Sequence, residues 1–222
     1  TNAGRVDPLA QIAAVCQQHN IWLHIDAAYG GFFRLVPGVE CLQGLELADS
    51  LSLDPHKSLY MPYGTGIFLC RRIPSCQWPR GANASYMPPL SDSILRLEYS
   101  DISPELSRDF RGLRLWMSLK VFGRQAYQQC LTEKYQLAQD FAQHLAQDRR
   151  LEILAMPDLS LFPWCVRDDQ DGQKTRELLT AINGTDQFYL TSCEYAGRFA
   201  IRTCILGFRT HSEHMAQLYA II

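Results

Sequence analysis

The amino-acid sequence predicts an α/β fold in which a mainly parallel sheet is followed by a small α+β domain. Three short apolar runs, each about the length of a strand, are separated by helical or loop segments, as in an α/β sheet. These runs are IWLHI at 21–25, DSLSL at 49–53 and GIFLC at 66–70. After Arg150 the pattern changes to short strands and two helices, which is typical of a separate α+β unit.

A long helical section connects these two parts, and Gly123 interrupts it. We therefore predict two domains: residues 1–123 belong to a large domain, and residues 124–222 form a connecting helix and a small C-terminal domain. Within the large domain, residues 75–102 are rich in Pro, Ser, Asn and Gly and show no clear periodicity. A stretch of this length is typical of a functional loop, and we interpret it as a catalytic loop.

The chain begins with TNAGRVDP, which is typical of a turn that leads into a helix. We expect Asp7 to cap this helix and Pro8 to occupy its first position. There is no initiator Met before Thr1, and this opening is typical of the middle of a domain. We therefore expect a fragment or processed piece of a longer polypeptide, for which the lack of a signal peptide carries no information.

The helices of the C-terminal part have two sequence signals. One apolar stripe follows Gly123 at helical spacing and predicts core packing. Its members are Tyr127, Leu131, Tyr135, Ala138, Phe141 and Leu145. The last helix is expected to begin at THSE, where Thr210 and Glu213 would form a capping box.

Composition argues against several classes of function. The 222 residues carry a formal net charge of −2 and no basic stripe with interleaved aromatic residues, which argues against a nucleic-acid partner. No apolar run approaches the roughly 18 residues of a membrane span, so we expect no membrane partner. The eight cysteines form no CxxC pair and no metal-ligand spacing. We therefore expect core thiols, a reducing cytoplasmic location and no metal site.

Two chemically useful side chains fall at the carboxyl ends of strands, where ligands collect in α/β sheets. Asp26 ends the first apolar run, and Lys57 follows the second, next to His56. A catalytic lysine must be kept partly unprotonated, which burial achieves, so we expect Lys57 to be buried. An acid followed by two alanines, against which a flat ring can lie, is the partner that a pyridinium nitrogen needs. Together these residues indicate a site for pyridoxal 5'-phosphate.

The motifs HIDAAYGG at 24–31 and DPHKSLYMPYGTG at 54–66 resemble those of the group II pyridoxal phosphate-dependent amino acid decarboxylases. This is the family of the glutamate, aromatic amino acid, cysteine sulfinate and histidine decarboxylases. The resemblance extends, in the family's order, to TNAGRVDP, ASYMPP, ELSRDFRGLRLWMSLKVFG and FAIRTCILGFRT. It covers almost the whole chain but only the C-terminal portion of the family. It implies fold type I of the pyridoxal phosphate-dependent transferases, with part of the large domain and the small domain.

The resemblance implies a role for each matching residue around the cofactor. Lys57 would carry the cofactor covalently, and Asp26 would pair with the pyridine nitrogen. Ala28 would pack on the ring, and His56 would contact the phosphate or the bound substrate. Thr1 matches a family threonine near the 3' oxygen of the cofactor.

Two further residues match positions that act on the substrate. Tyr86, in the loop, matches a tyrosine that delivers a proton to Cα after carbon dioxide leaves. Arg202 matches a position that meets a substrate carboxylate in the glutamate branch, although an arginine in mid-strand can also pair with a buried acid. The expected reaction converts a small L-amino acid to its amine and carbon dioxide, with the identity of the amino acid left open.

The resemblance also implies a homodimer with shared active sites, because in this family the loop that contains Tyr86 reaches the neighbouring subunit. The ring-stacking and most of the phosphate-binding residues of the family lie upstream of Thr1, so we expect the isolated chain to be inactive. Two alternatives remain open. One is a catalytically silent remnant or interaction module of the same fold. The other is a different fold type I reaction, such as transamination or carbon–sulfur cleavage.

Overall fold

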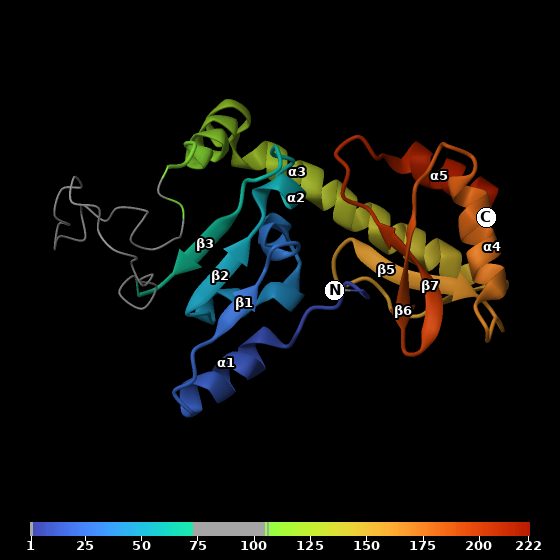
Figure 1. The fold of residues 1–222 in the computed structure, drawn as a ribbon, viewed down its shortest axis with the longest axis horizontal. Helices are drawn as coiled ribbons and strands as arrows, with labels where there is room; N and C mark the ends of the chain where they lie inside the picture. Colours follow the sequence, from blue (N-terminus) through green and yellow to red (C-terminus); the bar gives the residue numbers. More distant parts are fainter. Residues whose placement is uncertain (1, 73–104, 106) are drawn as a thin grey trace.

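The computed structural model describes residues 2–72, 105 and 107–222. Its helices are α1 (Leu9–Gln18), α2 (Pro55–Ser58), α3 (Arg111–Gln147), α4 (Gln173–Asn183) and α5 (Ser212–Ile221), with short 3-10 helices η1 (Gly31–Leu35), η2 (Glu40–Leu42) and η3 (Leu45–Leu47). Its strands are β1 (His24–Asp26), β2 (Ser50–Leu53), β3 (Ile67–Cys70), β4 (Leu151–Ile153), β5 (Leu161–Val166), β6 (Thr191–Tyr195) and β7 (Arg198–Cys204). The strands form two sheets, which lie beside different parts of α3 (Figure 1).

The first sheet has the order β1-β2-β3 and confirms the three predicted strands. Strands β1 and β2 are parallel, with Asp26 opposite Ser52, as the predicted sheet requires. Strand β3 runs antiparallel to β2, so the described part of this sheet is mixed rather than mainly parallel. The connection through α2 is short, and short connections suit antiparallel neighbours because a parallel return needs a longer crossover.

The two glycines of HIDAAYGG allow η1 to pack closely on its surroundings. A Cβ atom at Gly31 would overlap the Leu53 side chain of β2, and one at Gly30 would lie 2.7 Å from Cδ1 of Leu159. Side chains at these two positions would therefore push η1 away from β2 and from the segment before β5. The close packing places the end of β1 next to the turn that follows β2.

The N-terminal segment runs against the small domain. Gly4 has a φ of 67°, and a Cβ atom there would overlap the carbonyl group of Leu161 in β5. The backbone N–H of Val6 donates to Oδ2 of Asp158 at 2.8 Å, and Arg5 forms an ion pair of 3.2 Å with the same carboxylate. The segment before α1 is thus tied to residues about 150 positions further along the chain.

Both predicted helix starts need correction. Helix α1 begins at Leu9 with Pro8 as the N-cap residue, and no side chain caps it, so Asp7 does not have the predicted role. Helix α5 begins one residue later than the predicted box, with His211 as its N-cap residue. There the ring Nδ1 of His214 accepts the backbone N–H of His211 at 3.1 Å. The carbonyl of Thr210 accepts from the ammonium of Lys134 instead of taking part in the helix.

Helix α3 confirms the two predictions made for it. Gly123 has non-helical angles (φ 74°, ψ 162°) and marks a kink. Beyond this kink the predicted stripe is buried or partly buried, and its C-terminal members pack against the second sheet. That sheet is antiparallel throughout, in the order β4-β5-β7-β6, and its core includes Phe162, Trp164 and Ile201, each fully buried.

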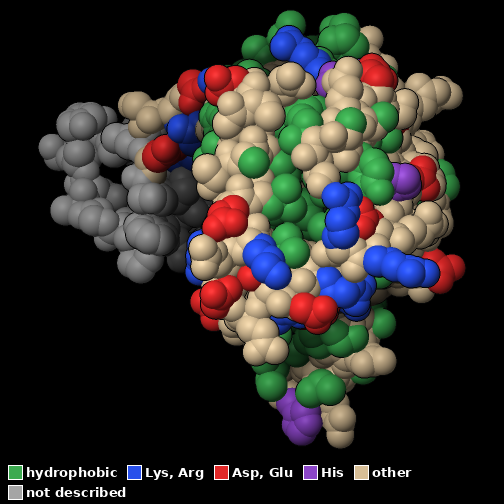
Figure 2. Space-filling model, turned by 90° about the vertical axis from the view of Figure 1, so that its right-hand side faces the viewer, with side chains coloured by type: hydrophobic (Ala, Val, Ile, Leu, Met, Phe, Trp, Pro, Cys, Tyr) green, Lys and Arg blue, Asp and Glu red, His purple; other side chains and the backbone are tan. Residues whose placement is uncertain are grey.

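The surface of the small domain is mixed in charge. Figure 2 shows Lys and Arg side chains next to Asp and Glu side chains on this side of the molecule, rather than one continuous basic area. Among the residues that the structure describes, no helix combines the length and the apolar character that crossing a membrane requires. The same residues contain no group of three or more His, Cys, Asp or Glu side chains arranged to hold a metal ion.

Candidate active site

The parallel pairing of β1 with β2 brings two strand ends together. Asp26 is the last residue of β1, and α2 follows β2 almost directly. The two ends are joined by backbone hydrogen bonds from Ala27 N to Ser52 O (2.9 Å) and from Asp54 N to Ala28 O (3.3 Å). The predicted acid and the predicted lysine therefore lie at the same edge of the sheet, where α/β folds bind their ligands.

The Asp26 carboxylate is fixed by two hydrogen-bond donors. Its Oδ1 accepts the backbone N–H of Ala28 and the hydroxyl of Ser52, each at 3.0 Å. These two bonds, with a smaller contribution from the positive charge of Lys57, lower the pKa of Asp26 below its usual value. The side chain is exposed to solvent. An ionised, oriented and accessible carboxylate of this kind is suited to hold a cationic ring nitrogen.

Lys57 differs from the prediction in its burial. Its side chain is 40% exposed, and its Nζ forms an ion pair of 2.8 Å with Oδ2 of Asp54. The reason is that Lys57 lies in α2, beyond the end of β2, so its amine reaches the open edge of the sheet. The described residues therefore keep Lys57 in place through Asp54 and not through an apolar environment.

His56 has one ring nitrogen committed to the backbone. Its Nδ1 lies 2.9 Å from the carbonyl oxygen of Thr65, which can only accept, so Nδ1 carries the proton of that bond. Its ring lies tilted against Tyr63, with 5.2 Å between the centroids. Its Nε2 is 3.8 Å from Oδ2 of Asp54. The orientation of His56 is thus fixed, and Nε2 is the nitrogen left for a ligand.

Three polar residues of the site were missed at the sequence level: Ser52, Asp54 and Ser58. Ser52 is found only through the strand register, which places it opposite Asp26. Ser58 is fully buried, and its hydroxyl donates to the carbonyl of Tyr29 at 2.6 Å. For Asp54 and Ser58 the one available signal was their place inside or next to the DPHK motif, where polar side chains need partners.

Ala28 and Arg202 lie in different surroundings. Ala28 is half-buried, and its N–H helps to hold Asp26. Arg202 is half-buried in mid-strand in β7, opposite Thr191 and Pro163. In the described part of the chain it forms no ion pair, so the alternative of a buried acidic partner is not found there. Its charge acts on Tyr29, whose own hydroxyl is 2.6 Å from that of Ser160.

Tyr29 lies between Arg202 and the turn that carries Lys57. Its hydroxyl end lies near Arg202 and the small domain, whereas its backbone carbonyl accepts from Ser58, the neighbour of Lys57. Burial raises the pKa of Tyr29 well above its usual value, so the hydroxyl is neutral. The other two predicted site residues, Thr1 and Tyr86, lie outside the described residues.

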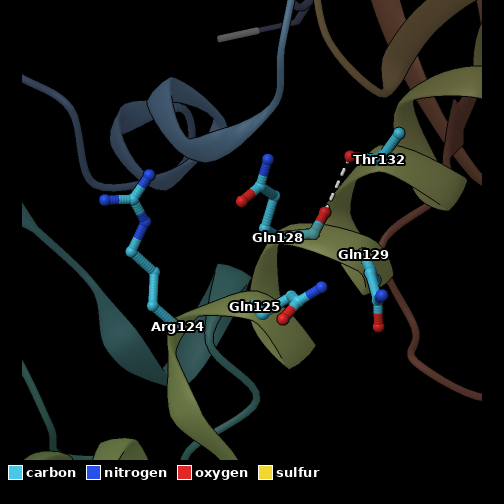
Figure 3. Close-up of a pocket in the computed structure, with 5 residues that line it drawn as sticks. All are labelled: Arg124, Gln125, Gln128, Gln129 and Thr132. Atoms are coloured by element: carbon cyan, nitrogen blue, oxygen red, sulfur yellow. Dashed lines mark hydrogen bonds between the residues drawn. The ribbon is translucent and has the colours of Figure 1, made fainter.

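A separate cavity of about 600 Å³ lies along α3. It is lined by Arg124, Gln125, Gln128, Gln129 and Thr132, all from this one helix (Figure 3). The hydroxyl of Thr132 is bonded to the backbone carbonyl of Gln128 at 2.7 Å. None of these residues belongs to the edge that carries Asp26 and Lys57. This cavity is therefore not the predicted cofactor site.

Comparison with known proteins finds relatives that belong to one family. The family model described as the pyridoxal-dependent decarboxylase conserved domain matches residues 1–165. The chain is 30% identical to an aromatic-L-amino-acid decarboxylase of Bacillus atrophaeus, over 98% of this chain and 47% of that protein. It is 27% identical to a phenylacetaldehyde synthase of Arabidopsis thaliana, over 100% of this chain and 47% of that protein.

A solved structure of Oryza sativa TDC with PLP and tryptamine superimposes with a TM-score of 0.87 at 25% identity. The superposition covers 100% of this chain and 47% of that one. The chain thus spans about half the length of the curated relatives that it matches.

Proposed function

Because this chain belongs to the pyridoxal-dependent decarboxylase family and has the fold type I architecture of its solved relatives, we propose that it supplies the lysine side of an active site that decarboxylates an L-amino acid with pyridoxal 5'-phosphate. The observation that carries the proposal is that Asp26 and Lys57 lie at the same edge of the first sheet. Asp26 is at the carboxyl end of β1, and Lys57 follows the carboxyl end of β2.

The residues at this edge fit the chemistry of that cofactor. A pyridine nitrogen that is to stay protonated needs an ionised acid, and Asp26 is held ionised by Ala28 N–H and Ser52. An aldehyde needs an accessible amine, and the Lys57 side chain is 40% exposed. When bound, the cofactor supplies an electron sink for the pair released by a broken bond at Cα.

Each proposed residue then has a defined task. Asp26 holds the proton on the ring nitrogen, and Ala28 offers a small surface on which the ring can rest. Lys57 would hold the cofactor covalently through its Nζ, in place of the present ion pair with Asp54. His56, oriented by Thr65, presents Nε2 to the phosphate or the substrate.

Three more residues complete the proposal. Arg202 binds a substrate carboxylate, which is consistent with a half-buried guanidinium that has no ion pair in the described part of the chain. Tyr86 delivers the proton to Cα, and Thr1 contacts the 3' oxygen of the cofactor. A positioned acid at the place of Tyr86 would favour the amine as product.

For the substrate, we propose an aromatic L-amino acid. The support is that relatives similar over nearly the whole chain are an aromatic-L-amino-acid decarboxylase and a phenylacetaldehyde synthase, both named for aromatic compounds. We further propose a homodimer with shared sites in the cytoplasm as the working form. A silent module of the same fold remains the competing hypothesis, and it predicts no reaction at Lys57.

The test is borohydride reduction of the full-length protein loaded with pyridoxal 5'-phosphate, followed by peptide mass spectrometry. We expect the pyridoxyl mass on Lys57, and its loss from this peptide in Lys57→Arg. Exposed Lys174 in the same sample reports non-specific labelling. Random labelling of surface lysines with an unmodified Lys57 would favour the silent module.

Product analysis then decides the reaction class. Incubation with L-tyrosine, L-tryptophan and L-glutamate should release carbon dioxide with an equal amount of amine from at least one aromatic substrate. A keto acid in place of the amine would indicate transamination. An aldehyde with carbon dioxide would indicate an aldehyde synthase, and Tyr86→Phe should move the product ratio in that direction.

A further inference from the structure

Tyr60 has a backbone conformation that tyrosine rarely adopts. It lies three residues after Lys57, and its φ of 56° places it in the left-handed region. A side chain with a Cβ atom is unfavourable there, and an aromatic one particularly so. Contacts elsewhere must therefore hold Tyr60 in this conformation, and such residues concentrate at functional sites.

The strained residue closes the turn that carries Lys57. The backbone N–H of Tyr60 donates to the carbonyl of Lys57 at 3.3 Å, and the N–H of Met61 donates to the carbonyl of Pro55 at 3.2 Å. At the other end, the N–H of Lys57 donates to the carbonyl of Asp54 at 2.9 Å. A change of φ at Tyr60 would therefore break the bond from Met61 to Pro55, which spans Lys57, and redirect the chain after the turn.

The side chain of Tyr60 is held by two distant segments. Its ring meets that of Phe208 edge-on, with 5.7 Å between centroids and 60° between planes. Its hydroxyl accepts the thiol hydrogen of Cys130 in α3 at 3.4 Å. The ring is half-buried and packs beside Leu59, Met61 and Tyr127. Burial raises the pKa of the Tyr60 hydroxyl, so the group is neutral and acts through packing.

We infer that Tyr60 is a positioning residue for Lys57: its ring, held between α3 and the segment after β7, keeps the lysine turn in the conformation that directs the amine to the edge of Asp26. The inference rests on the proposed function of Lys57. It also means that the small domain, through Phe208, helps to set the geometry of a group in the large domain.

The test measures the reactivity of the Lys57 amine in the full-length protein. Reductive methylation with formaldehyde and borohydride gives a rate without cofactor, and pyridoxal 5'-phosphate with borohydride gives a rate with it. Both rates are read by peptide mass spectrometry and divided by the rate at Lys174 in the same sample. Tyr60→Ala should lower the Lys57 ratio with pyridoxal 5'-phosphate roughly tenfold, because reaction with a bound aldehyde needs a positioned amine and a displacement of about 1 Å has effects of this size or larger. Its methylation ratio should also change, because the amine would leave its ion pair with Asp54.

Three further variants separate positioning from general loosening. Tyr60→Phe keeps the ring and should restore the wild-type ratio. Tyr60→Gly removes the ring but also the strain, so it should fold more readily than Tyr60→Ala and still lower the ratio. Tyr127→Ala removes a ring from the same cluster without a backbone bond to the lysine turn, and its ratio should match that of the wild type.

The outcomes keep the two hypotheses apart. If wild-type Lys57 reacts with formaldehyde but not with pyridoxal 5'-phosphate, the proposed function is wrong, while the methylation series still tests Tyr60. If Tyr60→Ala and Tyr60→Gly keep the wild-type ratio, the inference about Tyr60 is overturned. An equal loss in Tyr127→Ala would also overturn it, because the effect would then belong to the whole cluster.

Discussion

The two sheets of this protein are stabilised in different ways. In the small domain, five consecutive residues of β5 are buried, from Leu161 to Cys165, and both faces of this strand are covered. In the first sheet the burial alternates in β1, and β3 leaves Phe68 59% and Leu69 49% exposed. The side chains proposed for chemistry lie on the less buried sheet, where polar contacts hold them. The sheet that supports the fold and the sheet that presents the reacting groups are thus separate.

The largest expected effect is on the core of the small domain. Trp164 is fully buried, and its indole N–H donates to the hydroxyl of Thr203 at 2.9 Å. Trp164→Ala should lower the free energy of unfolding by about 3–5 kcal/mol. Urea unfolding measures this loss, with Trp22→Ala, at an exposed position, as the matched control. A loss of less than about 1 kcal/mol would contradict the view that the core of this sheet stabilises the fold.

A second effect of intermediate size is expected where the first sheet is close-packed. In Gly31→Ala the added Cβ would overlap Leu53, so we expect a loss of about 1–3 kcal/mol in unfolding free energy. The control is Gly112→Ala in α3, where the nearest atom would be an ordinary 3.5 Å away and φ is not in the left-handed region. There alanine should be neutral or stabilise by about 0.5–1 kcal/mol. Equal losses in both variants would mean that packing at Gly31 has no special importance.

A third effect concerns the start of α4 and depends on pH. Asp169 is buried, and its Oδ2 accepts the backbone N–H (2.8 Å) and the hydroxyl (2.6 Å) of Thr175. Although burial acts to raise the pKa of Asp169, its hydrogen bonds to Thr175 outweigh burial, so the pKa is lowered. Asp169→Asn should therefore cost about 1–2 kcal/mol at neutral pH.

The sign of the pH dependence follows from that lowered pKa. The ionised carboxylate stabilises the fold above the pKa of an unfolded aspartate, near 3.9, and this contribution is lost as the pH falls through the lower folded value. The stability difference between wild type and Asp169→Asn should therefore be full at pH 7 and shrink below about pH 4. Exposed Asp140→Asn is the control, and a difference that grows on acidification would contradict the assignment.

The smallest effect is expected at the exposed site. Ser52→Ala removes one of the two donors to Asp26 and should raise its pKa, with little change in stability because Asp26 is exposed. Binding of pyridoxal 5'-phosphate should weaken by roughly fivefold, the equivalent of one hydrogen bond of about 1 kcal/mol. Ser50→Ala, at the opposite end of β2, removes bonds to His24 and Trp22 and should leave this binding unchanged. Fluorescence titration measures both affinities.

The sequence predicted the position of this site better than it predicted the contacts that its residues make. The three strands and the shared edge of Asp26 and Lys57 could be predicted because strand length, apolar pattern and parallel pairing are local or follow from simple topology. The exposure of Lys57, its ion pair with Asp54 and the direction of β3 could not, since they depend on how a four-residue helix turns after β2. The predicted cap of α5 was wrong by one residue because the box is made by His211 and His214, which do not have the usual Ser/Thr and Glu/Gln pattern.

The contact between Gly4 and β5 has a consequence for the order in which the chain folds. Residues 2–6 reach their final environment only when Leu161 and Asp158 are in place, about 150 residues later in synthesis. Contacts of such high sequence separation form late and slow the folding of a domain. We therefore expect the segment before α1 to settle only after the small domain has been made, so that ribosome-bound chains ending before β5 should leave this segment open to proteolysis.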